Sequence, residues 1–518
     1  MNESTGTVGT LQTFKTVVDN PLTRNVLKSL SKYCSKDEGN RLEVALELYV
    51  GVRASACFRC RFSRKILSPV LSVACRAFGI TEAQLKEKFK DPYWRRGLLS
   101  VIKGIAWFGV RHPYVPGAPF QVVWNITKAC NMKCVHCYEN AGLPGQDELT
   151  TEEVLRGIDI LADIGVLILA FSGGEPTIRP DILRLIKRST ERGMFTAVAT
   201  NALVFTSRRK VKEFKKAGLK FVQISLDGLN PETHDKFRGV PGAFKKTVEG
   251  IKNCVAEDLF VEIATTATRF NYKEIPAMIE FAEKLGVNWF MLYNFVPTGR
   301  GVDIIESDLT PDEREDILKV CWNKMKTVGM EVLSTAPQFA RVAQEIEARP
   351  VPTGETGVIA TGVCGGTEAY IVPTHFYNPK LSGQLKRLAD FIGGCGAGRF
   401  YISLEPNGDM YPCVFFPHEN AVKIGNLFKD DFEEIWRNSK LLWRIRDKDK
   451  LAENCGSCDF RYTCGGCRAR AYNYFKDILA PDPGCILNRE FWNQIQTERK
   501  KNYFKKKTES GDILLEKA

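Results

Sequence analysis

Six strand-like apolar runs alternate with stretches of helical character from Phe120 onward. The runs read FQVVWNI, VLILAFSG, MFTAVAT, KFVQISLDG, LFVEIATTA and NWFMLYNF, and amphipathic stretches such as TEEVLRGIDILADIG lie between them. Strands that alternate with helices pair in parallel, because each helix carries the chain back along the sheet. The sequence therefore predicts an α/β fold, a partial (β/α)6 barrel, with a helical N-terminal region and a small cysteine-rich α+β C-terminal domain.

The chain is too long for one hydrophobic core, so we expect several domains. It has 518 residues, and single cores stop growing well below that length. Residues 1–115 carry mostly helical patterns, and the predicted βα units occupy residues 116–335. Residues 336–394 are rich in Pro and Gly and predict a bridge. Residues 395–495 hold the predicted cysteine-rich domain, and residues 496–518 form a basic tail.

Composition excludes several classes of protein. No uncharged apolar run reaches the roughly 18 residues of a membrane-spanning helix. The N-terminal MNESTGTVGTLQTFK lacks the apolar segment of a secretory signal, so we expect a cytoplasmic protein. The net charge of +12 favours an anionic partner, although we expect no nucleic acid. The 17 cysteines, an odd number in a chain without a signal, fit metal ligands better than disulfides.

Three cysteines, Cys130, Cys134 and Cys137, follow the first predicted strand in a C-x3-C-x2-C pattern. Loops at the carboxyl ends of parallel strands are where functional groups gather. A structural zinc site needs four ligands, whereas a 4Fe–4S cluster held by three thiolates keeps one iron open. With Tyr138 directly after it, the pattern resembles the signature of the radical SAM enzymes. The resemblance implies that S-adenosylmethionine (SAM) binds the open iron and that one electron cleaves it. The resulting 5′-deoxyadenosyl radical then removes a hydrogen atom from the substrate.

Further segments resemble that family in the same order along the chain. SGGEP ends the second predicted strand and resembles the motif whose backbone and glutamate hold the methionine amino group. Segments after the third, fourth and sixth strands resemble the remaining SAM contacts, with the ribose at the fourth and the adenine at the sixth. The resemblance thus implies these SAM-binding residues: Tyr138, Gly173, Gly174, Glu175, Pro176, Thr200, Asn201, Ser225, Asp227 and Arg300.

The C-terminal cysteines resemble the SPASM extension, which binds two auxiliary 4Fe–4S clusters. By that pattern, one cluster is held by Cys455, Cys458, Cys464 and Cys485. The other is held by Cys395, Cys413 and Cys467, and Cys364 is a candidate for its fourth ligand. The last pair is spaced x2 where the family pattern commonly has x3. Structural zinc is the alternative, because C-x2-C pairs also bind zinc.

The remaining cysteines carry weaker signals. Cys57 and Cys60 form a C-x2-C pair without a partner pair, since Cys34 and Cys75 are isolated in the sequence. We therefore expect helical positions with basic neighbours there, rather than a metal or redox site. Cys254 and Cys321 lie on apolar helix faces and are expected to be core thiols, and His136 is expected to pack beside the first cluster.

The family resemblance leaves the substrate open among a membrane lipid, a tetrapyrrole and a peptide. Residues 93–111, YWRRGLLSVIKGIAWFGVR, combine aromatic and aliphatic groups with Arg and Lys, as a helix in an anionic membrane interface does. The same pattern also suits a helix packed on the barrel. We favour an archaeal-type isoprenoid lipid, with peripheral contact at the inner face of the membrane. A tetrapyrrole of the haem pathway comes next and a peptide third.

Two further expectations follow from the resemblance. A radical SAM enzyme needs a low-potential electron donor such as ferredoxin or flavodoxin. A non-enzymatic iron–sulfur electron-transfer protein is the rival class, but it would need no SAM site. The SGGEP segment and the segment from Ser225 to Gly228 speak against that class.

Overall fold

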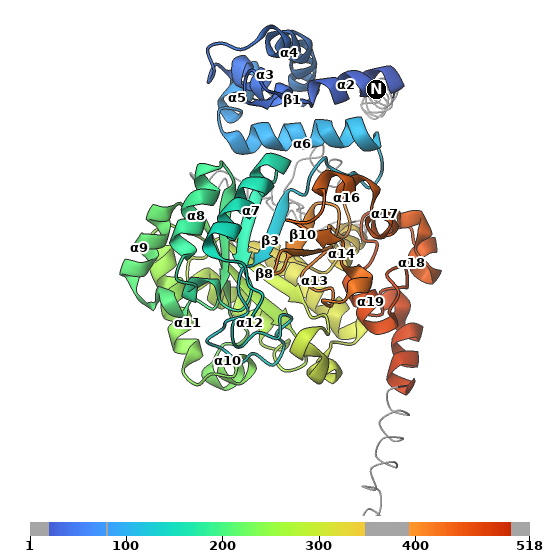
Figure 1. Ribbon diagram of the computed structural model, residues 1–518. Coiled ribbons are helices and arrows are strands. Elements are labelled where there is room, and N and C mark those ends of the chain that lie inside the picture. Colours follow the sequence, from blue (N-terminus) through green and yellow to red (C-terminus); the bar gives the residue numbers. More distant parts are fainter. Residues whose placement is uncertain (1–19, 79–80, 348–392, 499–518) are drawn as a thin grey trace, which may run out of the picture.

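The computed structural model describes residues 20–78, 81–347 and 393–498. Its centre is a curved parallel sheet with helices along its outer face (Figure 1). All six predicted strands form and pair in chain order, which confirms the predicted barrel units. They are β3 (Gln121–Asn125), β4 (Ile168–Ser172), β5 (Phe195–Thr200), β6 (Phe221–Ser225), β7 (Phe260–Ala267) and β8 (Trp289–Asn294).

Four more strands, none of them predicted, extend this sheet at its edges. β9 (Glu331–Ser334) pairs in parallel with β8, and β10 (Tyr401–Leu404) pairs in parallel with β3. β11 (Asp409–Tyr411) and β12 (Gly425–Asn426) continue the sheet in antiparallel fashion. No pairing between β9 and β12 closes the ten-stranded sheet within the described ranges, so the barrel is open. The cysteine-rich domain is thus joined to the barrel through β10.

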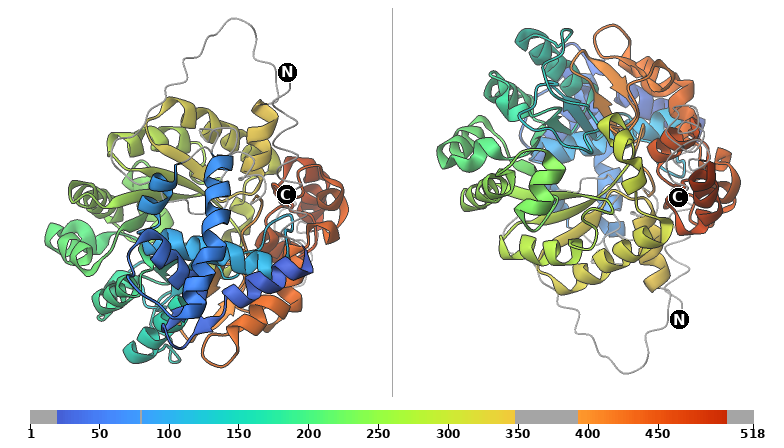
Figure 2. Two further views of the ribbon diagram at one scale, coloured as in Figure 1. Left: turned by 90° about the horizontal axis from the view of Figure 1, so that it is seen from above. Right: turned by 90° about the horizontal axis from the view of Figure 1, so that it is seen from below.

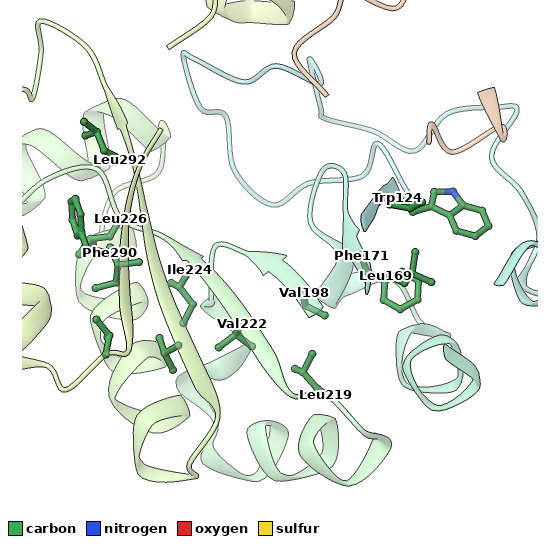
Figure 3. Packing of buried hydrophobic residues seen from close by; sticks show 14 of the residues in the cluster. Trp124, Leu169, Phe171, Val198, Leu219, Val222, Ile224, Leu226, Phe290 and Leu292 are labelled. Carbon is green, nitrogen blue, oxygen red and sulfur yellow. The ribbon is translucent and has the colours of Figure 1, made fainter. Parts of the chain in front are cut away.

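The barrel helices pack on the outward side of the strands and leave the inward side free. Leu169 and Phe171 of β4 point outward into the hydrophobic core, whereas Ala170 between them faces the interior (Figure 3). This alternation follows from the two-residue period of a strand. The covering helices are α7 (Thr151–Ile164), α8 (Ile182–Glu191), α9 (Arg208–Ala217), α11 (Ala243–Ala256), α12 (Ile275–Lys284) and α13 (Pro311–Thr327). The short helix α10 (Pro231–Arg238) packs on α11 and contacts the loop after β3.

Local signals set the ends of these helices. Thr150 and Glu153 form a capping box at the start of α7, and Gly165 ends the helix in the left-handed region. Thr310 and Glu313 form a capping box at the start of α13. The ends of these helices are therefore fixed by their own sequence.

Helices of the N-terminal region lie across the end of the barrel where the strands begin (Figure 2, left). They are α2 (Pro21–Leu30), α3 (Arg41–Val50), α4 (Phe58–Phe78), α5 (Glu82–Lys88) and α6 (Pro92–Phe108). In Figure 1, α6 lies between the other N-terminal helices and the barrel. Tyr93 of α6 is buried against Leu167, Ile168 and Phe195.

The interpretation of residues 93–111 as an interfacial membrane helix is wrong. The apolar face of α6 is covered on both sides, and both of its arginines form hydrogen bonds within the molecule. Arg95 donates to the carbonyl of Phe89, and Arg96 donates to the carbonyl of Arg192. Arg111, which lies beyond the end of α6, is exposed and donates to the carbonyl of Phe108. Among the described residues, no helix is both long enough and apolar enough to cross a bilayer.

The C-terminal domain packs beside β10 and continues the chain around the edge of the barrel (Figure 1). α14 (Gln338–Glu347) precedes it and packs on α13. The helices of the C-terminal domain itself are α16 (Phe432–Asn438), α17 (Lys440–Arg446), α18 (Glu453–Ser457) and α19 (Arg468–Phe475). Trp436 is fully buried and its indole donates to the carbonyl of Pro116, which ties this domain to the entry of the barrel.

Candidate active site

A chamber fills the interior of the sheet and lies between two groups of cysteines. Cys130, Cys134 and Cys137 line one side of it, and Cys395, Cys413 and Cys467 line another. The chamber has a cavity volume of about 250 Å³, close to the lower end of the ~300–1,000 Å³ of typical small-molecule pockets.

The loop after β3 points its three thiols into this chamber. The backbone N–H of Met132 donates to Cys130 Sγ at 3.4 Å, and that of Ala141 donates to Cys137 Sγ at 3.5 Å. Arg238 donates to Cys134 Sγ at 3.6 Å. Donors aimed at each sulfur stabilise the thiolate form that metal binding requires. These residues therefore fit a thiolate-bound cluster.

The two glycines of SGGEP let β4 approach the backbone of the cysteine loop. A Cβ on Gly174 would lie 2.2 Å from the carbonyl oxygen of Ala129, and one on Gly173 would lie 2.4 Å from that of Thr127. Gly173 also has a φ of +122°. The same contact carries hydrogen bonds from Gly174 N to Thr127 O (2.7 Å) and from Glu175 N to Ala129 O (2.8 Å). Any side chain at these positions would displace the cysteine loop.

Glu175 lies at the chamber wall, but its carboxylate is occupied by the chain itself. Its Oε1 accepts from the hydroxyls of Thr177 and Thr200, and its Oε2 accepts from the backbone N–H of Asn201. The pKa of Glu175 is raised above its ordinary value because burial disfavours the charged form, and these hydrogen bonds offset only part of that rise. In this structure Glu175 ties the end of β4 to the end of β5. Thr200, Asn201 and Ser225 also line the chamber, as do Gly173 and Gly174.

For Asp227, Pro176 and Arg300, which stay predicted SAM contacts, the structure shows the neighbours within the protein. Asp227 and Pro176 do not line the chamber. Asp227 is fully buried and lies 2.5 Å from Arg238, the residue that donates to Cys134 Sγ. Arg300 does line the chamber, but its guanidinium is held by the carbonyls of Cys134 and Ala141. Both charged side chains thus support the cysteine loop, a role that the family pattern did not indicate.

Aromatic side chains fix the surroundings of the cysteine loop. Tyr138 shares a hydrogen bond of 3.0 Å with Ser172 and packs edge-on against Phe415 of the C-terminal domain. His136 stacks on Phe237, and burial lowers the pKa of His136 so that it stays neutral. His136 therefore packs beside the loop, as expected.

The seven C-terminal cysteines fall into the two predicted groups. Cys395, Cys413 and Cys467 belong to one buried cluster that faces the chamber, and Phe415 N and Arg470 N donate to two of their sulfurs. The second group surrounds a separate small cavity; it consists of Cys455, Cys458, Cys464 and Cys485. Backbone N–H groups donate to Cys464 and Cys455 there as well. Cys364, the candidate fourth ligand of the first group, lies outside the described residues.

Sequence reasoning missed a set of polar residues in the middle of the chamber. Tyr293 donates to Gln223 at 2.8 Å, and Glu262 is buried beside them in the chamber wall. Burial raises the pKa of Glu262 to about 8, so its carboxyl group is protonated at neutral pH. The sequence held a sign of this, because every second residue of a strand points to the same face. Gln223 lies two residues from both Phe221 and Ser225, so all three side chains face the chamber.

An open parallel barrel with a three-cysteine loop at its carboxyl edge and two cysteine groups beside it defines a radical SAM enzyme with auxiliary clusters. Comparison with known proteins gives the same family. The radical SAM superfamily profile matches residues 124–282, and the SPASM iron–sulfur cluster-binding domain profile matches residues 395–459. The chain belongs to the radical SAM superfamily and carries a SPASM domain. Its cofactors are 4Fe–4S clusters and SAM.

Several relatives match this chain over most of their own length. An AdoMet-dependent heme synthase of Methanosarcina barkeri is 34% identical over 71% of this chain and 97% of the relative. An Fe-coproporphyrin III synthase of the same organism is 30% identical over 71% and 88%. The mycofactocin maturase MftC of Mycobacterium tuberculosis is also 30% identical, over 71% and 83%.

Among solved structures, SuiB of Streptococcus suis bound to S-adenosylmethionine is similar in fold. Its TM-score is 0.58 at 18% identity, over 86% of this chain and 91% of SuiB. None of the relatives named above is described as acting on a lipid. Together with the buried position of α6, these findings remove the support for an isoprenoid-lipid substrate.

Proposed function

We propose that this enzyme modifies a side chain of a tetrapyrrole in the haem pathway, the second of the substrates considered from the sequence. Two relatives, each matched over most of its length, have names that refer to tetrapyrroles: heme synthase and Fe-coproporphyrin III synthase. The observation in the structure that supports this proposal is the shape and polarity of the chamber between the two cysteine groups.

Much of the chamber wall is apolar and is built from small and aromatic residues. Ala170, Ala197, Ala199 and Ala264 face inward from β4, β5 and β7. Phe195, Phe221 and Trp289 lie where the strands begin, and Phe221 and Trp289 meet at a centroid distance of 5.8 Å. A methyl-lined wall is flat because it carries no long side chains, and aromatic rings stack well on a conjugated macrocycle. Such a lining suits a planar, largely apolar ligand.

We propose the following roles for the residues around that ligand. Cys130, Cys134 and Cys137 hold the SAM-binding cluster, and the backbone around Gly173 and Gly174 approaches SAM most closely. The cluster and SAM supply a 5′-deoxyadenosyl radical when reduced. The alanine wall holds the macrocycle with its side chain toward the cysteine loop, and the neutral Glu262 with Gln223 and Tyr293 offers hydrogen bonds to a polar substituent.

The auxiliary cysteine groups provide a route for electrons. Cys395, Cys413 and Cys467 face the same chamber, so a cluster held there lies beside the substrate. The group around Cys455 lies farther out, at its own cavity. We propose that a low-potential ferredoxin or flavodoxin supplies the electron that starts each turnover.

The test is anaerobic turnover with a panel of substrates. Reconstituted enzyme, SAM and dithionite are incubated with iron coproporphyrin III, with its metal-free form, or with an isoprenoid lipid extract. The tetrapyrrole arms should raise 5′-deoxyadenosine at least tenfold above the substrate-free rate, with a matching mass change in the tetrapyrrole. The triple variant Cys130→Ala, Cys134→Ala, Cys137→Ala should give none. Stimulation by the lipid extract but by neither tetrapyrrole would contradict the proposal.

A peptide substrate is the second candidate, because mycofactocin maturase is a relative at the same level of identity as Fe-coproporphyrin III synthase. A set of candidate precursor peptides forms a fourth arm of the same assay. If a peptide alone stimulates cleavage and gains a cross-link or loses a terminal carboxyl group, the tetrapyrrole proposal is wrong and the peptide candidate replaces it.

A further inference from the structure

Three thiols and one carboxylate meet in the N-terminal region, apart from the chamber and from both C-terminal cysteine groups. They belong to Cys34, Asp37, Cys57 and Cys60, and one ligand atom of each lies within 4.8 Å of the other three. Cys34 ends the hairpin strand β1 (Tyr33–Cys34), and Asp37 lies in the turn before β2 (Gly39–Asn40). Cys57 directly precedes α4, and Cys60 lies in its first turn. A hairpin and a helix start thus contribute two side chains each.

This arrangement corrects the expectation that Cys57 and Cys60 have no partner pair. The hairpin brings Cys34 to 3.7 Å from Cys57 Sγ. In the sequence, Cys34 and Asp37 are spaced x2, as are Cys57 and Cys60. Two x2-spaced pairs are typical of structural zinc sites, with Asp37 here at a position that is usually a cysteine. The aspartate in place of a fourth cysteine hides this pattern in the sequence.

The distances match a single tetrahedral ion. Zinc–sulfur bonds of about 2.3 Å at tetrahedral angles place two sulfurs about 3.8 Å apart, and a sulfur and a carboxylate oxygen about 3.6 Å apart. The observed separations are 3.7 Å between the sulfurs of Cys34 and Cys57, and 3.6 Å from Cys34 Sγ to Asp37 Oδ2. The sulfurs that hold a 4Fe–4S cluster lie farther apart, because the whole cluster separates them. None of the cysteine groups predicted for clusters is this compact among the described residues.

The surroundings of the four side chains prepare them for a cation. The backbone N–H of Cys57 donates to Asp37 Oδ1 at 3.0 Å, and the Oδ2 of Asp37 faces Cys34. Such a hydrogen bond orients a ligating carboxylate. Cys34 and Cys60 are buried against Val44 and Leu48, where thiolates and a carboxylate side by side would repel one another without a positive ion. The positive end of α4 adds to the stabilisation of the sulfurs at its start.

We propose that Cys34, Asp37, Cys57 and Cys60 bind one zinc ion through three thiolates and one carboxylate oxygen. All four coordination positions come from the protein, so the site is structural rather than catalytic. Binding releases the three thiol protons to solvent. The ion joins the hairpin to α4, which packs with α3 and α6 in one hydrophobic cluster. Through Tyr93 of α6, the ion supports the part of the molecule that covers the base of the chamber.

The test is metal analysis and zinc X-ray absorption on the full-length holoenzyme, grown with zinc and loaded with its iron–sulfur clusters. We expect about one zinc per chain besides the iron, with three sulfurs at about 2.3 Å and one oxygen at about 2.0–2.2 Å. Cys57→Ser with Cys60→Ser should lower zinc at least tenfold and leave iron unchanged. Cys75→Ser, on the same helix but outside the group, should keep the zinc. Asp37→Cys should keep it with a fourth sulfur.

Several results would overturn the proposal. These are less than 0.1 zinc per chain in zinc-replete holoenzyme, zinc retained by the double serine variant, or a Cys34–Cys57 disulfide in alkylated, unreduced protein. A four-sulfur zinc shell together with a shortfall of about four irons would place the zinc in a cluster site and would also overturn it. If the double variant does not fold, the spectrum of the wild-type enzyme still decides. None of these readings depends on turnover, so a failed substrate assay leaves this result intact.

Discussion

At the scale of single residues, two charged groups that the family pattern assigns to SAM, Asp227 and Arg300, also support the cysteine loop. Asp227 holds Arg238, and Arg238 reaches Cys134 Sγ. Arg300 holds the carbonyls of the same loop. The sequence shows which residues stand at the strand ends but not which neighbour each side chain meets. For this reason the cysteine groups could be predicted, whereas the direction of these charged side chains could not.

The close contact at Gly174 gives the first prediction. Gly174→Ala places a methyl group 2.2 Å from the carbonyl oxygen of Ala129, so the cysteine loop must shift. We expect a loss of about four irons per chain and at least a tenfold fall in 5′-deoxyadenosine formation. Gly142→Ala is the matched control, because Gly142 lies in the same loop and its Cβ would meet nothing within 4 Å. Equal iron content and rate in both variants would contradict the assignment of this loop.

Glu262 gives a prediction about pH. Burial raises its pKa from an ordinary 4.5 to about 8, so the folded protein holds a proton that the unfolded chain has released. This group therefore costs stability increasingly as pH rises from about 5 to 8, by at most about 1.4 kcal/mol per pH unit. Glu262→Gln removes the cost, and its melting temperature relative to wild type should rise across that range. A constant difference between pH 5 and pH 8 would show that Glu262 keeps an ordinary pKa.

At the scale of elements, the sequence predicts what repeats and misses what depends on distant partners. The six barrel strands were predictable because each is a long apolar run followed by a helix. β9 and β10 are short, and β10 joins the barrel strands by pairing with β3, which lies far away in the chain. The amphipathic pattern correctly predicted that α6 is a helix. The pattern does not show whether a membrane or a barrel covers the apolar face of that helix.

The position of α6 predicts the effect of changing it. Tyr93 is 7% exposed and packs on the end of the barrel where the strands begin. Tyr93→Ala should therefore lower the free energy of unfolding by about 3–5 kcal/mol, as truncations of buried aromatic side chains do. Leu22→Ala on α2 is the control, since Leu22 is 76% exposed and should change stability by less than about 0.5 kcal/mol. Thermal unfolding of the two variants makes the comparison. Equal melting temperatures would restore the interpretation of α6 as a surface helix.

At the scale of the whole molecule, the chain joins three cysteine groups around one sheet. Cysteines separated by more than 250 residues, such as Cys130 and Cys395, face one chamber because β10 adds to the edge of the barrel. Motif order along the chain predicted the groups themselves. It could not predict that one auxiliary group would share the chamber while the other has its own cavity.

This arrangement predicts about twelve irons per chain, from three clusters of four. Anaerobic reconstitution followed by iron and sulfide analysis measures the number. Replacing Cys455, Cys458 and Cys464 by Ser should remove about four irons, because these residues line a separate cavity. A total near four irons in the wild-type enzyme would mean that the C-terminal groups hold no iron–sulfur clusters.

The central claim is that a hydrogen atom leaves a tetrapyrrole side chain inside the chamber. The most direct test uses iron coproporphyrin III deuterated on its side chains, with anaerobic enzyme, SAM and reductant. Mass spectrometry then reads the deuterium content of the 5′-deoxyadenosine. We predict that one deuterium per molecule appears in 5′-deoxyadenosine and that its amount matches the modified tetrapyrrole. Unlabelled 5′-deoxyadenosine, formed at the same rate with or without the tetrapyrrole, would contradict the account.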